Sequence, residues 1–245
     1  DKWIDHYICV GDTEGRIAQA LKEKGYDVDI DKTITLGYLH DIGKIGIPDH
    51  LWNKPGRLTE DEYTLIKQHT VIGANILKGV TMVPHLSEVT RSHHERYDGT
   101  GYPDGLKGEE IPLYARIVSV ANCFDAMHSR RIYREALPVE TIKEKISQNA
   151  GTQFDPEIAQ IFLRLMEEGK LELAVAKADT NTHHDFPVPS YELTMNRFIA
   201  DVVNAFKGQE DKKSYDMLTG LPSRNLGEIL IAHTMKKSEG CLAFI

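Results

Sequence analysis

The stretch LHDIGK, residues 39–44, sets a histidine and an aspartate side by side where an apolar helix ends. With Asp31 as its N-cap and apolar residues at helical spacing, the preceding segment predicts a helix over 31–43. Neighbouring helical residues point about 100° apart, so His40 and Asp41 can bind one metal ion, or the carboxylate can bridge two. The stretch therefore marks a candidate metal-binding pair at the end of a helix, although one such dipeptide is weak evidence when taken alone.

Three further histidines extend this pattern. His69, in KQHT, lies on a second predicted helix, and His93 and His94 form a pair on a third, expected over about 84–97. With the histidine–aspartate pair they give four imidazoles and one carboxylate, a donor set suited to iron, manganese, nickel or zinc rather than magnesium or calcium. A lone histidine is more often a surface or packing residue, but their joint occurrence in one helical region favours metal binding.

The remaining sequence up to residue 170 predicts further helices and no strand. A helix that includes Thr13 is expected to stop at Gly25, and a capping box at Thr59 opens the helix that carries His69. Pro112 fits the first position of another helix, which has a buried apolar stripe. The region is therefore expected to be all-α.

The composition limits the classes of partner. The 245 residues are 41% hydrophobic and 27% charged, which is typical of a soluble globular protein, and the net charge is −8. This charge argues against DNA, RNA or an anionic membrane as partner, so a basic pocket or a metal must compensate an anionic ligand. The three cysteines are isolated, which favours a cytoplasmic location, and we expect neither a signal peptide nor a membrane segment.

The motifs HDIGKIGIPD (40–49), HHERYDGTGYPDGLKGEEIP (93–112) and RRIYREAL (130–137) resemble the HD-GYP branch of the HD-domain metal-dependent phosphohydrolases, over about residues 1–170. The resemblance implies an HD-domain helical bundle that hydrolyses the bacterial messenger cyclic di-GMP to linear pGpG, GMP or both by a metal-bound hydroxide. It also implies two divalent transition-metal ions, with Fe or Mn favoured over Zn or Ni.

The resemblance also implies roles for single residues. The metal ligands would be His6, His40, Asp41, His69, His93 and His94. Asp41 would also be catalytic, together with Lys44, which would meet a phosphate. The substrate would be contacted by Gly101, Tyr102, Pro103, Arg131 and Arg134. The residues themselves agree, because glycines let the backbone approach a flat ligand closely and Tyr102 offers a ring or a hydroxyl.

Two residues depart from the family pattern. Lys2 stands where three-metal members have a glutamate, so we expect two metal ions at most. Asn122 stands where the family has an aspartate that closes the metal site, and its lack of charge should weaken metal binding and catalysis. Two alternatives therefore stay open beside the active enzyme: a weakened module that binds cyclic di-GMP or a partner and regulates an attached cyclase domain, and a nucleotidase for another phosphate ester.

The remaining sequence predicts the domain organisation. We expect an HD-GYP domain over 1–177, a linker over 178–190, a connecting helix over 191–213 and an α/β segment over 214–245. YDMLTGLPSR (215–224) resembles the opening of GGDEF diguanylate cyclase domains, but the segment stops before that family's signature loop, so no cyclase activity is expected of it. The connecting helix is a candidate for homodimerisation and for contact with GGDEF-domain partners.

Overall fold

The computed structural model describes residues 2–81, 83–129, 136–171, 237–238 and 241–242. The expected linker, the connecting helix and nearly all of the GGDEF-like segment lie outside these residues, as do Arg131 and Arg134. The helices are α1 (Lys2–Glu23), α2 (Ile30–Leu39), the 3₁₀ helix η1 (Ile42–Gly46), α3 (Asp49–Trp52), α4 (Glu60–Leu77), α5 (Leu86–Ser92), the 3₁₀ helix η2 (Gly108–Glu110), α6 (Leu113–His128), α7 (Val139–Gln148) and α8 (Pro156–Glu167). Two short antiparallel strands, β1 (Lys237–Ser238) and β2 (Cys241–Leu242), pair Lys237 with Leu242.

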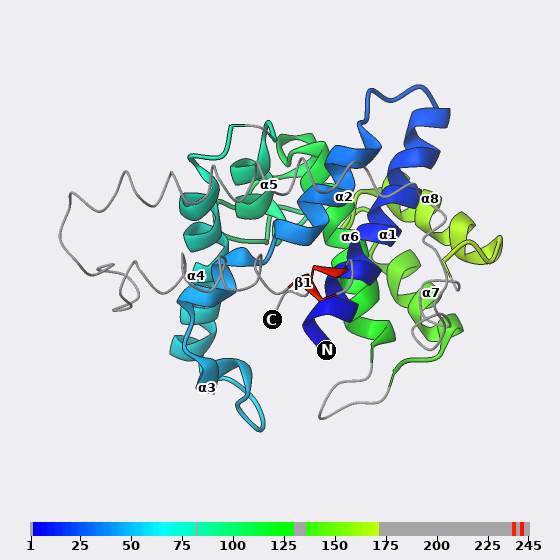
Figure 1. Ribbon diagram of the computed structural model, residues 1–245. Coiled ribbons are helices and arrows are strands. Elements are labelled where there is room, and N and C mark those ends of the chain that lie inside the picture. The colour runs from blue at the N-terminus through cyan, green and yellow to red at the C-terminus, as the bar shows by residue number, and fades with distance from the viewer. Residues whose placement is uncertain (1, 82, 130–135, 172–236, 239–240, 243–245) are drawn as a thin grey trace.

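The helices form two groups with α2 between them (Figure 1). On one side α4 packs on α5 and on η1, and on the other α1 packs against α6 and α8, with α7 against α6 and α8. Because α2 contacts α1, α5 and α6, it joins the two groups. Within residues 2–171, as far as the structure describes them, no β-strand occurs, and an isolated bridge joins Ala150 and Phe154, so the all-α prediction is confirmed for this part.

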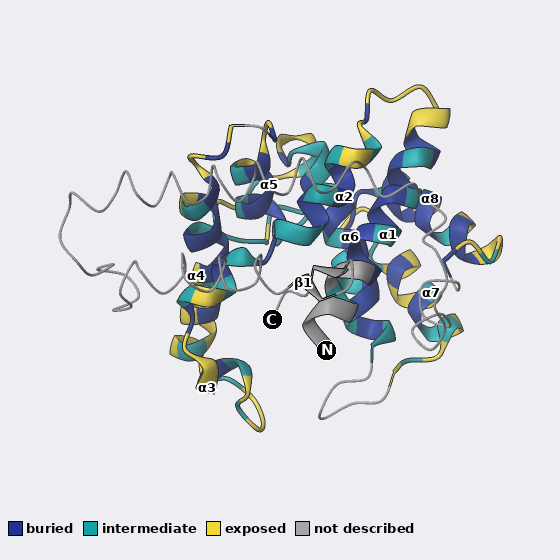
Figure 2. Cartoon of the chain, in the orientation of Figure 1, coloured by how far each residue is buried: buried dark blue, intermediate teal, exposed yellow. Residues whose placement is uncertain are grey.

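The larger hydrophobic core lies among α1, α6, α7 and α8, where buried residues concentrate in Figure 2. Phe124 of α6 and Phe162 of α8 meet edge to face at its centre, with 5.2 Å between ring centroids. Asp155 starts α8 by accepting hydrogen bonds from the amides of Glu157 and Ile158. Burying an apolar side chain such as Phe124 or Phe162 contributes roughly 1.5–3 kcal/mol. Many such contacts fix α1 and α6 relative to one another.

A second core joins α2, α4, α5 and α6, with Leu36, Leu77 and Leu86 almost fully buried. Beside it, two backbones meet at Gly43 of η1. A Cβ at this position would collide with the carbonyl oxygen of His69 and the amide nitrogen of Gly73, both on α4. Only glycine fits there, and this close approach brings the end of α2 next to the histidine of α4.

Several helix boundaries differ from the sequence predictions. Helix α1 begins at Lys2, well before Thr13, and α2 is capped by Asp29, whose carboxylate accepts from the amide of Lys32, so the predicted Asp31 cap was wrong. Pro112 is the N-cap of α6 and not its first residue. The capping box at Thr59 and Glu62 is confirmed.

The largest difference concerns the third histidine-bearing helix, expected over 84–97. It ends at Ser92, so His93 and His94 lie in the turn that follows α5 and not on the helix. On a helix, two neighbouring side chains would point about 100° apart, and in the turn they are not held to this angle. Their rings lie 4.2 Å apart between centroids, and both enter the same cluster.

Candidate metal centre

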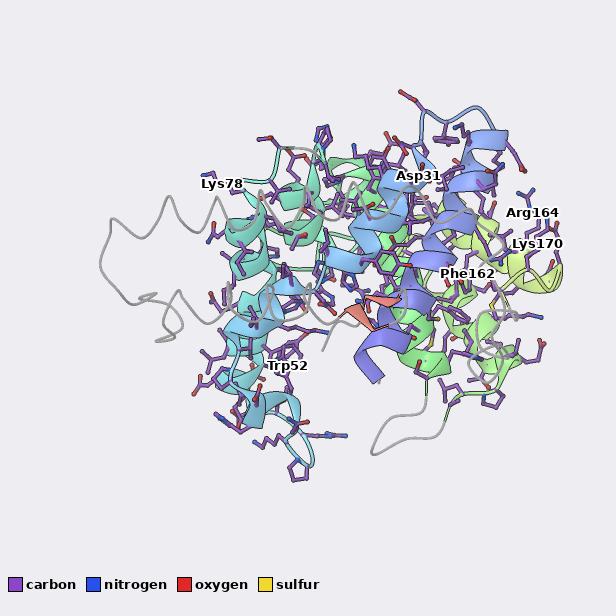
Figure 3. The ribbon with its side chains drawn as sticks, viewed as in Figure 1. Asp31, Trp52, Lys78, Phe162, Arg164 and Lys170 are labelled. Carbon is purple, nitrogen blue, oxygen red and sulfur yellow. The ribbon has the colours of Figure 1, made fainter. Side chains whose placement is uncertain are left out.

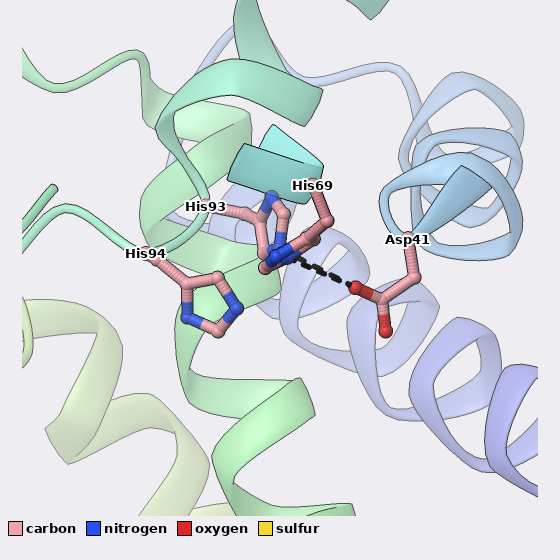
Figure 4. A group of neighbouring side chains, drawn as sticks. All are labelled: Asp41, His69, His93 and His94. Atoms are coloured by element: carbon pink, nitrogen blue, oxygen red, sulfur yellow. Dashed lines mark hydrogen bonds and ion pairs between the residues drawn. The ribbon is translucent and has the colours of Figure 1, made fainter. Parts of the chain in front are cut away.

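The histidine–aspartate pair lies where two helices meet. His40 is the C-cap of α2 and donates its backbone N–H to Leu36, while Asp41 precedes the first residue of η1. The chain changes direction between these helices, so Asp41 faces His69 and His93, while the His40 ring lies near those of His6 and His93. This junction therefore positions the Asp41 carboxylate opposite the three histidines of the site (Figure 4).

Three imidazoles are oriented by the same kind of backbone hydrogen bond. The Nδ1 atoms of His40, His69 and His93 each lie 2.6–2.7 Å from the carbonyl oxygen three residues earlier in the chain. A carbonyl only accepts, so each Nδ1 carries the proton and each Nε2 keeps its lone pair. Backbone hydrogen bonds of this kind are typical of metal-bound histidines, because they fix the tautomer and the ring plane.

The Nε2 atoms surround the Asp41 carboxylate. Their distances to its oxygens are 3.2 Å from His40, 3.4 Å from His69 and 3.7 Å from His93. These exceed a normal N–H···O hydrogen bond of about 2.9 Å. Ligands about 2.1 Å from one metal lie roughly 3.0 Å apart in octahedral and 3.4 Å apart in tetrahedral geometry. The spacing therefore fits metal donors, with His69 and His93 facing Oδ1 of Asp41 and His40 facing Oδ2.

The donors fall into two groups that share Asp41. The deep group consists of Asp41, His69, His93 and His94, and the outer group of His6, His40 and Asp41; within each group the ligand atoms lie within 4.8 Å of one another. Figure 4 shows the deep group, with the three histidines on one side and Asp41 facing them. Because each group offers imidazole nitrogen and carboxylate oxygen, the donor chemistry fits divalent transition-metal ions.

Burial shifts the charge states of the deep group. It lowers the pKa of His69 to about 4 and the pKa of His94 well below its usual range, with the neighbouring imidazoles adding to the effect. Burial would raise the pKa of Asp41, but the Lys44 ammonium and His40 outweigh it and hold that pKa well below normal. The group therefore presents neutral imidazoles and an ionised carboxylate at neutral pH, which is the state that binds metal.

His6 is the candidate ligand of the outer group that comes from α1. Its Nδ1 lies 2.6 Å from Asp125 of α6, which also accepts from the Ser129 hydroxyl at 2.8 Å, and its Nε2 lies 3.5 Å from Asp41. Burial lowers the pKa of His6, but the two carboxylates beside it outweigh burial and raise that pKa above its ordinary value.

Sequence reasoning gave Asp125 no role in the site. The available signal was its spacing of three residues from Asn122, which places both on nearly the same face of α6.

The glycine-rich loop after His94 is fixed by internal contacts. The buried carboxylate of Glu95 accepts hydrogen bonds from the amides of Asp104, Gly105 and Leu106, at 2.7, 3.1 and 3.1 Å. A Cβ at Gly101 would collide with the backbone of residues 95–96, so the fold itself requires glycine there. Close approach of this loop to its own chain, rather than to a ligand, is what the structure shows at this position.

The structure brings most of the predicted residues together. The six predicted ligands form the two groups, Lys44 makes an ion pair with Asp41, and the Tyr102 ring stacks on His94 at 4.9 Å between centroids. Pro103 follows Tyr102 through a cis peptide bond. No position can be given for Arg131 and Arg134, which lie outside the described residues. No helix among the described residues is long and apolar enough to span a membrane.

The fold and the site define a class, a helical domain that gathers histidines around one shared aspartate. A family model described as "HD domain" matches residues 14–158, so the chain belongs to the HD domain family.

Individual relatives and solved structures are also similar. A cyclic di-GMP phosphodiesterase of Thermotoga maritima is 44% identical over 165 residues, which cover 66% of this chain and 44% of that protein. A 3′3′-cGAMP-specific phosphodiesterase of Vibrio cholerae, number 3, is 40% identical over 49% of this chain and 26% of its own length. The chain thus spans less than half the length of these relatives.

A solved structure supports the fold. The crystal structure of a cyclic GMP-AMP specific phosphodiesterase of Vibrio cholerae (V-cGAP3) superposes with a TM-score of 0.56 and 19% identity, over 83% of this chain and 54% of that one.

Proposed function

We propose that this chain carries a metal-dependent phosphodiesterase domain that hydrolyses cyclic di-GMP. The observation that carries the proposal is the pair of donor groups that share Asp41, since such an arrangement can hold two ions side by side. The similarity to the Thermotoga maritima protein, named a cyclic di-GMP phosphodiesterase, supports the choice of substrate. The products we propose are linear pGpG, GMP or both.

The six predicted ligands would hold two divalent transition-metal ions, Fe or Mn in preference to Zn or Ni. When bound, such ions lower the pKa of a water molecule and neutralise charge on a phosphate. The remaining roles fall to side chains of the protein. Asp41 would be a ligand in both donor groups. Lys44, whose side chain is 22% exposed and which pairs with Asp41, can donate a hydrogen bond to a phosphate oxygen. Tyr102 forms the wall next to His94, and we assign Arg131 and Arg134 to further phosphate or base contacts.

The experiment combines elemental analysis of anaerobically purified protein with a turnover assay. About two ions per chain and hydrolysis of cyclic di-GMP are expected. Because one relative is named as specific for 3′3′-cGAMP, that nucleotide is assayed in parallel, and faster hydrolysis of it would change the proposed substrate. Metal-loaded protein that hydrolyses neither nucleotide would contradict the proposal.

Asn122 favours a second candidate, a weakened module that binds the nucleotide or a partner and regulates an attached cyclase domain. The amide at this position lies on α6 one turn before Asp125, and thus on the side of the outer group. We expect Asn122→Asp to raise metal content and turnover, measured by elemental analysis and by initial rates. Rapid two-metal hydrolysis by the unchanged protein would rule this candidate out.

Three further proposals concern the protein's surroundings. We propose that residues 191–213 form a helix that mediates homodimerisation or contacts a GGDEF domain, on the basis of its amphipathic sequence. Size measurement with and without this segment tests the first. We also propose a cytoplasmic location, on the basis of three cysteines that are isolated in the sequence.

A further inference from the structure

A row of rings leads from the metal centre to the surface. The Tyr102 ring lies nearly parallel to the His94 imidazole, at an angle of 22°, and the ring of Tyr63 on α4 meets Tyr102 at 80° with 6.3 Å between centroids. Tyr63 is 44% exposed, in contrast to the partly buried Tyr102. The row therefore begins at a candidate ligand and ends at a ring that a bound molecule can reach.

Lys67 lies over both tyrosines. Its Nζ is 4.5 Å from the centroid of Tyr63 and 5.6 Å from that of Tyr102. Residues 63 and 67 are four apart on α4, so they share one face of the helix. The ammonium is thus held beside the exposed ring and close to the centre.

The charge of Lys67 is not compensated by a carboxylate within the described part of the chain. Other lysines of this acidic protein do have carboxylate partners, as in the pairs Lys24–Glu157, Lys54–Glu62, Lys143–Glu140 and Lys170–Glu168. Within the same described residues, the Lys67 ammonium lies over the two tyrosine rings. A cation in this setting remains available to an anionic ligand.

We propose that Tyr63 and Lys67 form a binding subsite for one purine base of a cyclic dinucleotide and the phosphate next to it, a proposal that rests on the proposed function. An exposed tyrosine offers a face on which a purine stacks, and the adjacent ammonium pairs with phosphate oxygen. Tyr102 uses one face on His94, and Lys67 lies over one face of Tyr63, but Tyr63 is the more exposed of the two rings and the one that a base can reach. The subsite would hold the nucleotide at the α4 side of the centre.

The test measures equilibrium binding and steady-state kinetics of cyclic di-GMP with the metal-loaded full chain. Tyr63→Leu is expected to weaken binding and raise KM about 10-fold or more, with kcat within about twofold. Lys67→Met is expected to act in the same direction, and Tyr63→Phe, which keeps the ring, to stay within about twofold. Inorganic phosphate, which carries no base, should bind equally to the unchanged protein and to Tyr63→Leu.

Two matched controls separate the subsite from general effects. Tyr26→Leu removes another exposed tyrosine, and Lys78→Met removes the lysine at the C-terminal cap of α4 (Figure 3). Both should leave KM unchanged. Since Tyr63 and Lys67 could also act only as a helix-stabilising pair, Tm is measured for every variant; a lower Tm with unchanged KM and Kd overturns the proposal.

The outcomes distinguish the subsite from the proposed function. Hydrolysis by the unchanged protein with unaltered Kd in both variants overturns the subsite and leaves the phosphodiesterase standing. Binding without hydrolysis, weakened by Tyr63→Leu, supports the subsite and overturns the phosphodiesterase. No binding of cyclic di-GMP by metal-loaded protein overturns both.

Discussion

The two halves of the centre are built by different means. In the deep half, His69 and His93 are at most 1% exposed and are oriented by backbone carbonyls of their own helical turns. In the outer half, His40 is oriented by a backbone carbonyl in the same way, but His6, which is 11% exposed, is oriented by a side chain from another helix, Asp125. A backbone carbonyl is present whatever the sequence, whereas a carboxylate can be lost by one substitution. One substitution can therefore change metal binding in the outer half more easily than in the deep half. Asn122 lies on α6 one turn before Asp125, which belongs to the outer half.

The largest effect is expected from a change at Asp41, the residue that the two halves share. Asp41→Asn should lose both metal ions and reduce turnover about 1,000-fold or more, because each donor group loses its only carboxylate. Elemental analysis and initial rates check this, with Asp31→Asn, an exposed aspartate of α2, as control. A variant that keeps two tightly bound ions would show that Asp41 is not the shared ligand.

Acidification should separate the halves without mutation. Metal binds neutral imidazole, so protons compete at a histidine once the pH falls to its pKa. That pKa is raised above 6.5 for His6 and lowered to about 4 for His69. As the pH falls from 8 toward 5.5, the outer ion should be lost first and the deep ion retained. Equilibrium dialysis with metal analysis measures this, and simultaneous loss of both ions would contradict it.

Asp125→Asn should loosen only the outer half. The amide keeps the size of the carboxylate but removes its charge from the imidazole, which lowers the affinity for one ion about 10- to 100-fold. Metal titration should then show one weakened and one unchanged site. Glu60→Gln, at an exposed position on α4, serves as control. Equal weakening at both sites would indicate a general loss of structure.

The last effect leaves the metal ligands unchanged and concerns stability, through a residue on the same helix as His6. Glu14 is fully buried against Gly37 of α2, its two oxygens have no hydrogen-bond partner among the described residues, and burial raises its pKa well above normal. The unfolded pKa is about 4.3, so the folded state binds more protons above this pH and stability falls, by about 1.4 kcal/mol per pH unit, until the raised pKa is reached.

Glu14→Gln removes this titration. Its free energy of unfolding relative to the unchanged protein should therefore rise between pH 5 and pH 7. Urea unfolding at matched metal content measures the difference. Parallel pH profiles for the two proteins would show that Glu14 does not titrate differently in the folded state.

Much of the fold was predictable because helix signals are local. The capping box at Thr59 follows from a short pattern that the structure confirms. The predicted end of α2 at Gly43 was wrong, since the helix ends at Leu39 and Gly43 lies in η1. The N-cap of α2 was misassigned because Asp29 and Asp31 are both good caps and local sequence does not choose between them. The helix before His93 was predicted too long for a similar reason. No glycine, proline or other local stop signal in the sequence marks its end at Ser92.

By itself, the sequence predicted the donor types: five histidines and an aspartate, with the motifs that tie them to one family. Only the tertiary structure decided how they divide. Asp41 is shared because Gly43 lets η1 touch the backbone of α4, and His6 is oriented because α1 packs on α6 next to Asp125. Those contacts join residues far apart in the chain, so their effect depends on packing that no local pattern contains.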